Sequence, residues 1–124
     1  MPEAAPDIRV KRIYDPPGGK DGARVLVDRL WPRGVRKETA ELTEWLKDIA
    51  PSAELRRWFG HDPARFAEFS RRYRAELSAN KDAVGQMDDF IKSGPVTLLY
   101  AAHDEEHNHA RVLAEYLKAR AMGA

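Results

Sequence analysis

Apolar and polar positions along the chain follow two different periods, which predicts strands that alternate with helices. Residues 8–14 alternate apolar with basic side chains, as in a strand near the edge of a sheet. Residues 23–29 and 96–100 contain mostly apolar runs, as in strands buried on both faces. The loop over residues 15–22 separates the first two strands, because its two prolines and three glycines do not fit a regular element.

The segment between the second strand and Pro51 is ambiguous. Its apolar side chains fall at helical spacing over residues 38–49, which predicts a helix. A short strand over residues 42–46 fits the same letters, so both interpretations stay open at this point.

Capping residues predict where the later helices begin. Ser52 can cap a short helix that Gly60 ends, and Asp62 can cap the next helix with Pro63 at its first position. Further helices are predicted over residues 81–92 and after Asp104. The helix after Pro63 carries a stripe of apolar side chains that faces the core: Phe66, Phe69, Tyr73 and Leu77.

This order of elements is typical of an α/β protein with a small, mostly parallel sheet. We expect three or four strands with helices packed on them, a three-layer αβα arrangement. A chain of 124 residues fits one domain, residues 1–124, which buries about two thirds of its unfolded surface. Residues 1–7 are expected to form a disordered or extended tail.

The composition narrows the possible functions. Lys plus Arg (21) nearly balance Asp plus Glu (20), so any preference for a polyanion would come from local clusters of charge. The absence of cysteine excludes a disulfide framework and a thiolate nucleophile. No apolar segment approaches the ~20 residues that a bilayer span requires, and the chain starts without a signal-like segment. The sequence therefore predicts a cytoplasmic protein that does not associate with membranes.

Polar side chains follow Val27 in one buried strand and Leu99 in the other. The carboxyl ends of parallel strands lie at one edge of the sheet, where open α/β sheets bind their ligands. We therefore expect one crevice that is lined by side chains from both loops: Asp28, Arg29, Trp31, Arg33, Tyr100, His103, His107 and Asn108.

Three strings of residues carry a resemblance to a known family. They are LVDRLWPRG at 26–34, WFGHDP at 58–63 and LLYAA at 98–102, with a His-Asn pair shortly afterwards. Together they resemble the YeaO-like branch of domain-of-unknown-function family 488. The resemblance implies no established activity. It also implies that thiol chemistry cannot be transferred to this chain, because longer relatives carry cysteines and a basic residue around the positions that are here Tyr100, Asn108 and Ala110.

Arg29 and Arg33 are the candidate residues for holding an anion, because a guanidinium group binds carboxylate or phosphate in a bidentate manner. In the competing structural interpretation, Asp28 forms an ion pair with an arginine and Trp31 fills the core. His61 is the candidate general acid or base, together with Asp28. Further ligand contacts are expected from Trp31, Tyr100, His107 and Asn108.

The histidine-rich run from His103 to His109 invites a metal-site interpretation, since residues four apart share a helix face. Asp104 followed by two glutamates fits a helix start better, because a cap and early acids complement the helix dipole. The family resemblance also includes His107 and Asn108 but neither of the two outer histidines. We therefore predict no metal site and no cofactor.

These observations favour a protein that binds a small phosphorylated or carboxylated ligand. The sequence leaves open whether it is an enzyme; if it is, hydrolysis or group transfer on that ligand is expected. The alternative is a non-catalytic nucleic-acid-binding or regulatory module that uses the arginine-rich face between Arg56 and Arg74. The net charge of +1 makes nucleic acid the less favoured partner.

Overall fold

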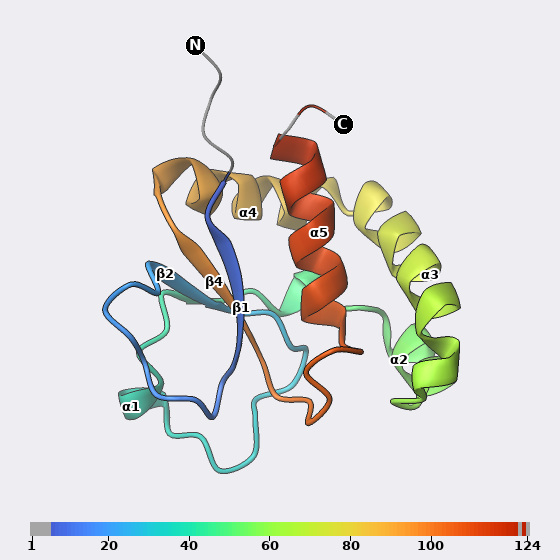
Figure 1. Ribbon diagram of the computed structural model, residues 1–124, viewed down its shortest axis with the longest axis horizontal. Coiled ribbons are helices and arrows are strands. Elements are labelled where there is room, and N and C mark those ends of the chain that lie inside the picture. The colour runs from blue at the N-terminus through green and yellow to red at the C-terminus, as the bar shows by residue number, and fades with distance from the viewer. Residues whose placement is uncertain (1–5, 122, 124) are drawn as a thin grey trace.

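Four parallel strands form the centre of the protein (Figure 1). The computed structural model describes residues 6–121 and 123, so residues 1–5 of the predicted tail lie outside the described residues. The strands are β1 (Ile8–Arg12), β2 (Ala23–Leu26), β3 (Glu44–Trp45) and β4 (Val96–Tyr100), in the order β1-β4-β2-β3. Strand β4 is central and pairs in parallel with both β1 and β2. The predicted α/β class and parallel sheet are confirmed.

The longer helices pack together against one face of the sheet. They are α2 (Ala53–Phe59), α3 (Phe66–Ala79), α4 (Lys81–Ser93) and α5 (His109–Ala121), and one-turn 3-10 helices at Lys47–Ile49 and Pro63–Arg65 precede α2 and α3. Their apolar side chains share one cluster with Val25, Val27 and Leu98 of the sheet. Burial of this cluster provides the main hydrophobic stabilisation of the fold.

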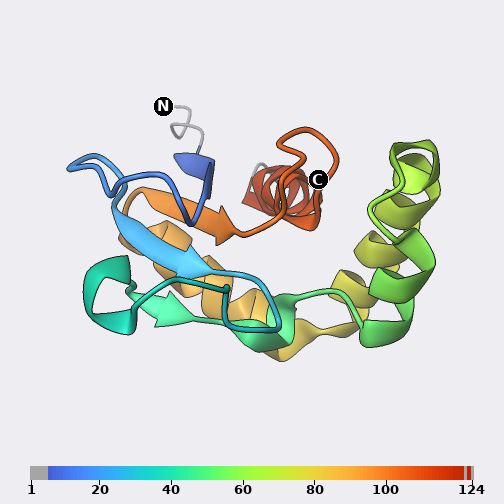
Figure 2. The same ribbon diagram turned by 90° about the horizontal axis from the view of Figure 1, so that it is seen from below.

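The other face of the sheet is covered mainly by irregular chain. Leu26 and Leu99 point to this side and pack with a smaller apolar group that includes Trp31 and Trp45. This outer layer is the segment over residues 31–43, in which α1 (Lys37–Ala40) forms a single helical turn, and Figure 2 shows α1 and α5 on opposite sides of the sheet. The three layers are therefore present, with one of them reduced to a loop and a short helix.

The predicted helix over residues 38–49 is wrong, and the short-strand alternative is correct. Helix α1 ends at Glu41, whose backbone is left-handed with φ 51°. Trp45 packs on the outer face, whereas Leu46 and Ile49 reach the main core, so consecutive apolar side chains point to opposite sides of the sheet. The segment forms a strand and not a helix because β3 pairs with β2 at the edge of the sheet.

The predicted caps Ser52, Gly60 and Asp62 are confirmed. The Ser52 hydroxyl accepts a hydrogen bond from the Leu55 amide at 3.2 Å, and Gly60 ends α2 in the left-handed conformation. The Asp62 carboxylate accepts from the Ala64 amide at 3.0 Å and starts the turn that leads into α3. Within the described residues, no helix is both long and apolar enough to cross a bilayer.

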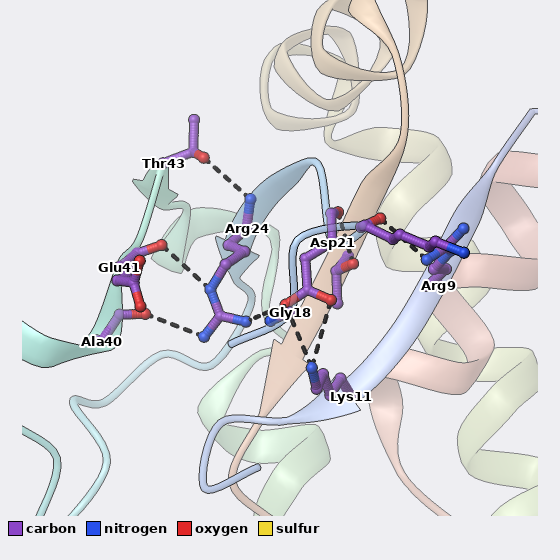
Figure 3. A network of polar contacts seen from close by, with 10 residues as sticks. Arg9, Lys11, Gly18, Asp21, Arg24, Ala40, Glu41 and Thr43 are labelled. Atoms are coloured by element: carbon purple, nitrogen blue, oxygen red, sulfur yellow. Dashed lines mark hydrogen bonds and ion pairs between the residues drawn. The ribbon is translucent and has the colours of Figure 1, made fainter. Parts of the chain in front are cut away.

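A buried ion pair between Asp21 and Arg24 holds the outer layer to the start of β2 (Figure 3). The Arg24 guanidinium donates to the Asp21 carboxylate at 2.6 Å and to the carbonyl oxygens of Ala40 and Glu41. Lys11 adds a second positive charge, at 3.3 Å from the same carboxylate. Every charge in this group thus has partners from another segment, the arrangement that buried ions require.

The same network anchors the glycine-rich loop before β2. The Gly18 amide donates to the Asp21 carboxylate at 2.9 Å, and the Thr97 hydroxyl donates to the Asp21 carbonyl oxygen at 2.7 Å. The hydrogen bond from Gly18, with those from Arg24 and Lys11, holds the pKa of Asp21 below its ordinary value.

Replacing Asp21 by Asn is expected to lower the free energy of unfolding by about 3–5 kcal/mol at neutral pH, because Arg24 would stay buried without a counter-charge. The folded pKa of Asp21 is depressed, so this stabilisation is present above the unfolded pKa and is lost as pH falls through the folded value. Urea unfolding at several pH values should show the gap between wild type and variant closing in acid. Asp7→Asn, which removes an exposed ion pair with Arg9, is the control and should unfold like wild type. A constant gap across the acid range would contradict this account.

Candidate functional site

A cavity of about 550 Å³ opens at the carboxyl ends of β2 and β4. Three parts of the chain form it: residues 28–30 after β2, residues 50–61 around α2, and residues 101–109 between β4 and α5, with Phe69 of α3 closing one wall. This is the edge of the sheet that the sequence predicts for the site, and the two predicted loops do meet there. The parallel pairing of β2 with β4 produces this meeting.

Asp28 connects the end of β2 with the segment between β4 and α5. One of its carboxylate oxygens accepts a hydrogen bond from the Ala101 amide at 3.0 Å, which ties the end of β2 to the chain leaving β4. The other oxygen lies 3.1 Å from Nε2 of His109, the first residue of α5. The Asp28 carbonyl oxygen accepts from the Trp45 indole at 2.7 Å, which fixes the backbone of the same residue.

His109 is a cavity residue that the sequence analysis missed. Its Nε2 lies 3.0 Å from the Val27 carbonyl oxygen, so this nitrogen carries the proton and points to the end of β2. The side chain is 15% exposed and its ring stands edge-on to buried Tyr73. In the sequence, His109 is one of three histidines in a polar run. It differs from the other two because it is the first residue of α5.

Arg29 and Arg56 bring positive charge to the cavity from two different walls. Arg29 makes a long hydrogen bond of 3.4 Å to the Ala50 carbonyl oxygen, and Arg56 lies in the middle of α2. Among the described residues, neither forms an ion pair with a carboxylate, and the Nε of each is shielded from solvent without a hydrogen-bond partner. Such buried, unpaired donors are rare in proteins.

Three of the predicted ligand-binding residues do not line the cavity. Trp31 donates its indole N–H to the Val35 carbonyl oxygen at 2.7 Å and packs edge-on against Trp45 in the outer layer. Arg33 is exposed, and Tyr100 is buried with its backbone in β4. Burial raises the pKa of the Tyr100 hydroxyl. Arg29 and Arg33 therefore separate, because the chain turns away from the cavity after Leu30.

The loop between β4 and α5 is built around Asp104. Its carboxylate accepts from the backbone amides of Glu106 and His107 and lies 2.9 Å from Nδ1 of His107, and these backbone hydrogen bonds lower its pKa. The prediction that Asp104 caps the last helix is wrong, because α5 begins at His109 and the Asn108 side chain accepts from the Arg111 amide. Asn108 is therefore a buried helix cap at the cavity wall.

His61 lines the cavity from the turn between α2 and α3. Its backbone is left-handed with φ 57°, directly after left-handed Gly60, and its ring lies 6.2 Å from that of Phe59. Non-glycine residues rarely adopt this conformation, and those that do cluster at functional sites. Together with His103, His107 and His109, it places all four histidines of the chain around one cavity.

Among the described residues, no three His, Cys, Asp or Glu side chains are grouped closely enough to hold a metal ion. The cavity lining there also contains no Ser, Thr, Cys, Lys or Tyr. The groups available for proton transfer are the histidines and the carboxylates of Asp28 and Asp104.

The arginines of the proposed nucleic-acid face are mostly engaged with neighbours. Glu68 pairs with Arg71 and Arg72, whose hydrogen bonds lower its pKa, and Arg74 pairs with Glu115. Arg72 also lies 4.3 Å from the centre of the Trp58 ring. Arg56 differs from these residues, because it faces the cavity.

Comparison with known proteins places this architecture in a family. The profile of a family described as "Inactive DUF488-N3 subclade" matches residues 7–123. The chain belongs to the DUF488 family. The resemblance seen in its motifs is thereby confirmed over nearly the whole chain.

Two relatives that the chain resembles carry names that state no activity. The chain is 46% identical to the uncharacterised protein YeaO of Escherichia coli (strain K12) over 112 residues, which cover 90% of this chain and 97% of YeaO. It is 42% identical to the uncharacterised protein Rv3073c of Mycobacterium tuberculosis (strain ATCC 25618 / H37Rv) over 113 residues, which cover 91% of this chain and 95% of that protein. No solved structure gives a significant match.

Replacing His61 by Gly is expected to raise the free energy of unfolding by about 0.5–1 kcal/mol, because glycine adopts the left-handed conformation without a steric penalty. Gly60→Ala is the matched control and should lower it by about 1 kcal/mol for the same reason. Urea unfolding of both variants measures the effect. If His61→Gly were clearly less stable than wild type, contacts of the imidazole would hold the turn, and backbone strain would not be present at the cavity.

Proposed function

We propose that this protein binds a small anionic ligand, phosphorylated or carboxylated, in the cavity through Arg29 and Arg56. The observation that carries the proposal is the state of these two guanidinium groups. Both line the cavity, and among the described residues neither has a carboxylate partner, while each has a shielded Nε with no hydrogen bond. Two cations that line one cavity favour an anion as their partner.

An anionic ligand would remove an energetic cost that the unliganded protein bears. A buried donor without a partner costs about 1–3 kcal/mol, and more when the group is charged. An arginine presents Nε and one terminal nitrogen side by side, which matches the two oxygens of a carboxylate or phosphate. A rotation of either guanidinium into the cavity would present this pair of donors to the ligand.

The carboxylates of the cavity do not cancel the two arginines. One oxygen of Asp28 accepts from the Ala101 amide, and the other lies 3.1 Å from His109 Nε2 but makes no hydrogen bond. Asp104 is held by two backbone amides and His107. Among the described residues, neither acid forms an ion pair with Arg29 or Arg56. The positive charge of Arg29 and Arg56 stays available to a ligand.

Binding without turnover is the role that we favour. The family is described as inactive, and the cavity lining over the described residues lacks hydroxyl, thiol and amine nucleophiles. The sequence makes Asp28 a candidate for proton transfer, but in the structure its carboxylate holds the end of β2 to the chain that leaves β4. His61 remains the candidate acid or base if a reaction takes place. The nucleic-acid alternative receives less support, because Arg71, Arg72 and Arg74 are paired with glutamates.

Replacing Arg56 by Gln is expected to weaken the binding of inorganic phosphate and citrate by at least about tenfold, the loss that removal of one charged hydrogen bond of ~1.5 kcal/mol produces. Thermal shift at constant ionic strength measures this, because a ligand that binds only the folded state raises Tm with its concentration. Arg29→Gln should behave in the same way.

Arg33→Gln is the matched control, since Arg33 carries the same charge in the neighbouring turn but does not line the cavity. It should retain the shift of the wild type. Equal shifts in the Arg56→Gln and Arg33→Gln variants would contradict the proposal, because the anion would then act through general charge and not through this site.

A further inference from the structure

Most of the cavity wall is apolar, although its charged groups favour an anion. Ala50, Pro51, Phe59, Phe69 and Ala101 all contribute to the lining. Phe59 and Phe69 stack with their ring centres 4.3 Å apart and are only 5% and 1% exposed, so they close the cavity from the core side. An inorganic anion would leave the apolar part of the lining unused.

Leu30 adds an apolar side chain at the edge of the same cavity. It is 67% exposed and is one of two large hydrophobic residues that are exposed among the described residues. Leu30 directly follows Arg29, so neighbouring residues bring an apolar and a cationic side chain to the same cavity. A ligand with an apolar part would cover this exposed apolar side chain when it binds in the cavity.

The size of the cavity leads to the same conclusion. A volume of about 550 Å³ lies within the range of sites that bind organic molecules, about 300–1,000 Å³, in which mostly apolar walls carry a few well-placed polar groups. A phosphate or acetate ion would fill only a small part of it.

We infer that the ligand is an amphiphilic anion, a carboxylate or phosphate monoester attached to an apolar body. Its charged group lies against Arg29 and Arg56, and its body covers Leu30, Ala101 and Ala102. This inference rests on the proposed function and specifies the class of ligand.

Isothermal titration calorimetry with three matched probes tests the inference. At constant ionic strength, 2-naphthoate should bind at least tenfold more tightly than acetate, which has the same charged group without the aromatic body. It should also bind at least tenfold more tightly than 2-naphthylmethanol, which has the body without the charge. 2-Naphthyl phosphate, compared with 2-naphthoate, then shows which anionic group the arginines prefer.

Variants separate the two parts of the ligand. Leu30→Ser should weaken 2-naphthoate at least threefold and leave acetate unchanged, and the side chain is exposed enough for the fold to tolerate the change. Tyr14→Ser is the control, because Tyr14 is the other exposed large hydrophobic residue and does not line the cavity.

Each other outcome has a definite meaning. Equal affinity for acetate and 2-naphthoate, or an unchanged affinity in Leu30→Ser, would overturn the ligand class and leave the anion site intact. Equal affinity for 2-naphthoate and 2-naphthylmethanol, or no binding of any anionic probe, would overturn the anion site and the ligand class together.

Discussion

The carboxylate of Asp28 is the contact on which the geometry of the cavity depends. It receives the Ala101 amide from the chain leaving β4 and lies against His109 at the start of α5, while its own backbone continues from β2. The end of β2 is thereby fixed to both ends of the segment between β4 and α5, at one edge of the sheet. The parallel register of β2 and β4 makes the contact possible, because both strands end at the same edge.

The charged groups at the two ends of β2 differ in whether they have partners within the protein. At the start of the strand, Asp21 and Arg24 have their partners within the fold, and the network fastens loops to the sheet. Beyond its end, Arg29 and Arg56 have Nε atoms with no partner among the described residues. Satisfied ions account for stability, whereas unsatisfied cations beside a cavity support the proposal that their partner is a ligand.

Much of the fold could be predicted from local patterns. The runs at Val25–Val27 and Val96–Tyr100 are apolar enough to specify buried strands, and the caps Ser52 and Asp62 fix helix starts through one hydrogen bond each. The segment over residues 38–49 could not be decided, because its apolar spacing suits a helix and a strand alike. Only the pairing of β3 with β2 resolves it.

The location of the cavity was predictable, but its complete set of residues was not. Arg29 and Arg33 look equivalent in the sequence, and the turn after Leu30 sends only the first to the cavity. Arg56 is hidden among the arginines of a helical face, since nothing in the string Arg56-Arg57 shows which one points inward. His109 reaches Asp28 because α5 starts four residues later than the acidic run suggests.

The Nε–H signals of arginine in a proton–nitrogen NMR spectrum test the central claim most directly. The signals of Arg29 and Arg56 can be assigned with their Gln variants and followed while 2-naphthyl phosphate is added. The account predicts that both Nε protons shift downfield as they form hydrogen bonds to the anion, while the signals of exposed Arg33 and Arg57 stay in place. Saturation of the protein with no change at Arg29 and Arg56 would contradict it.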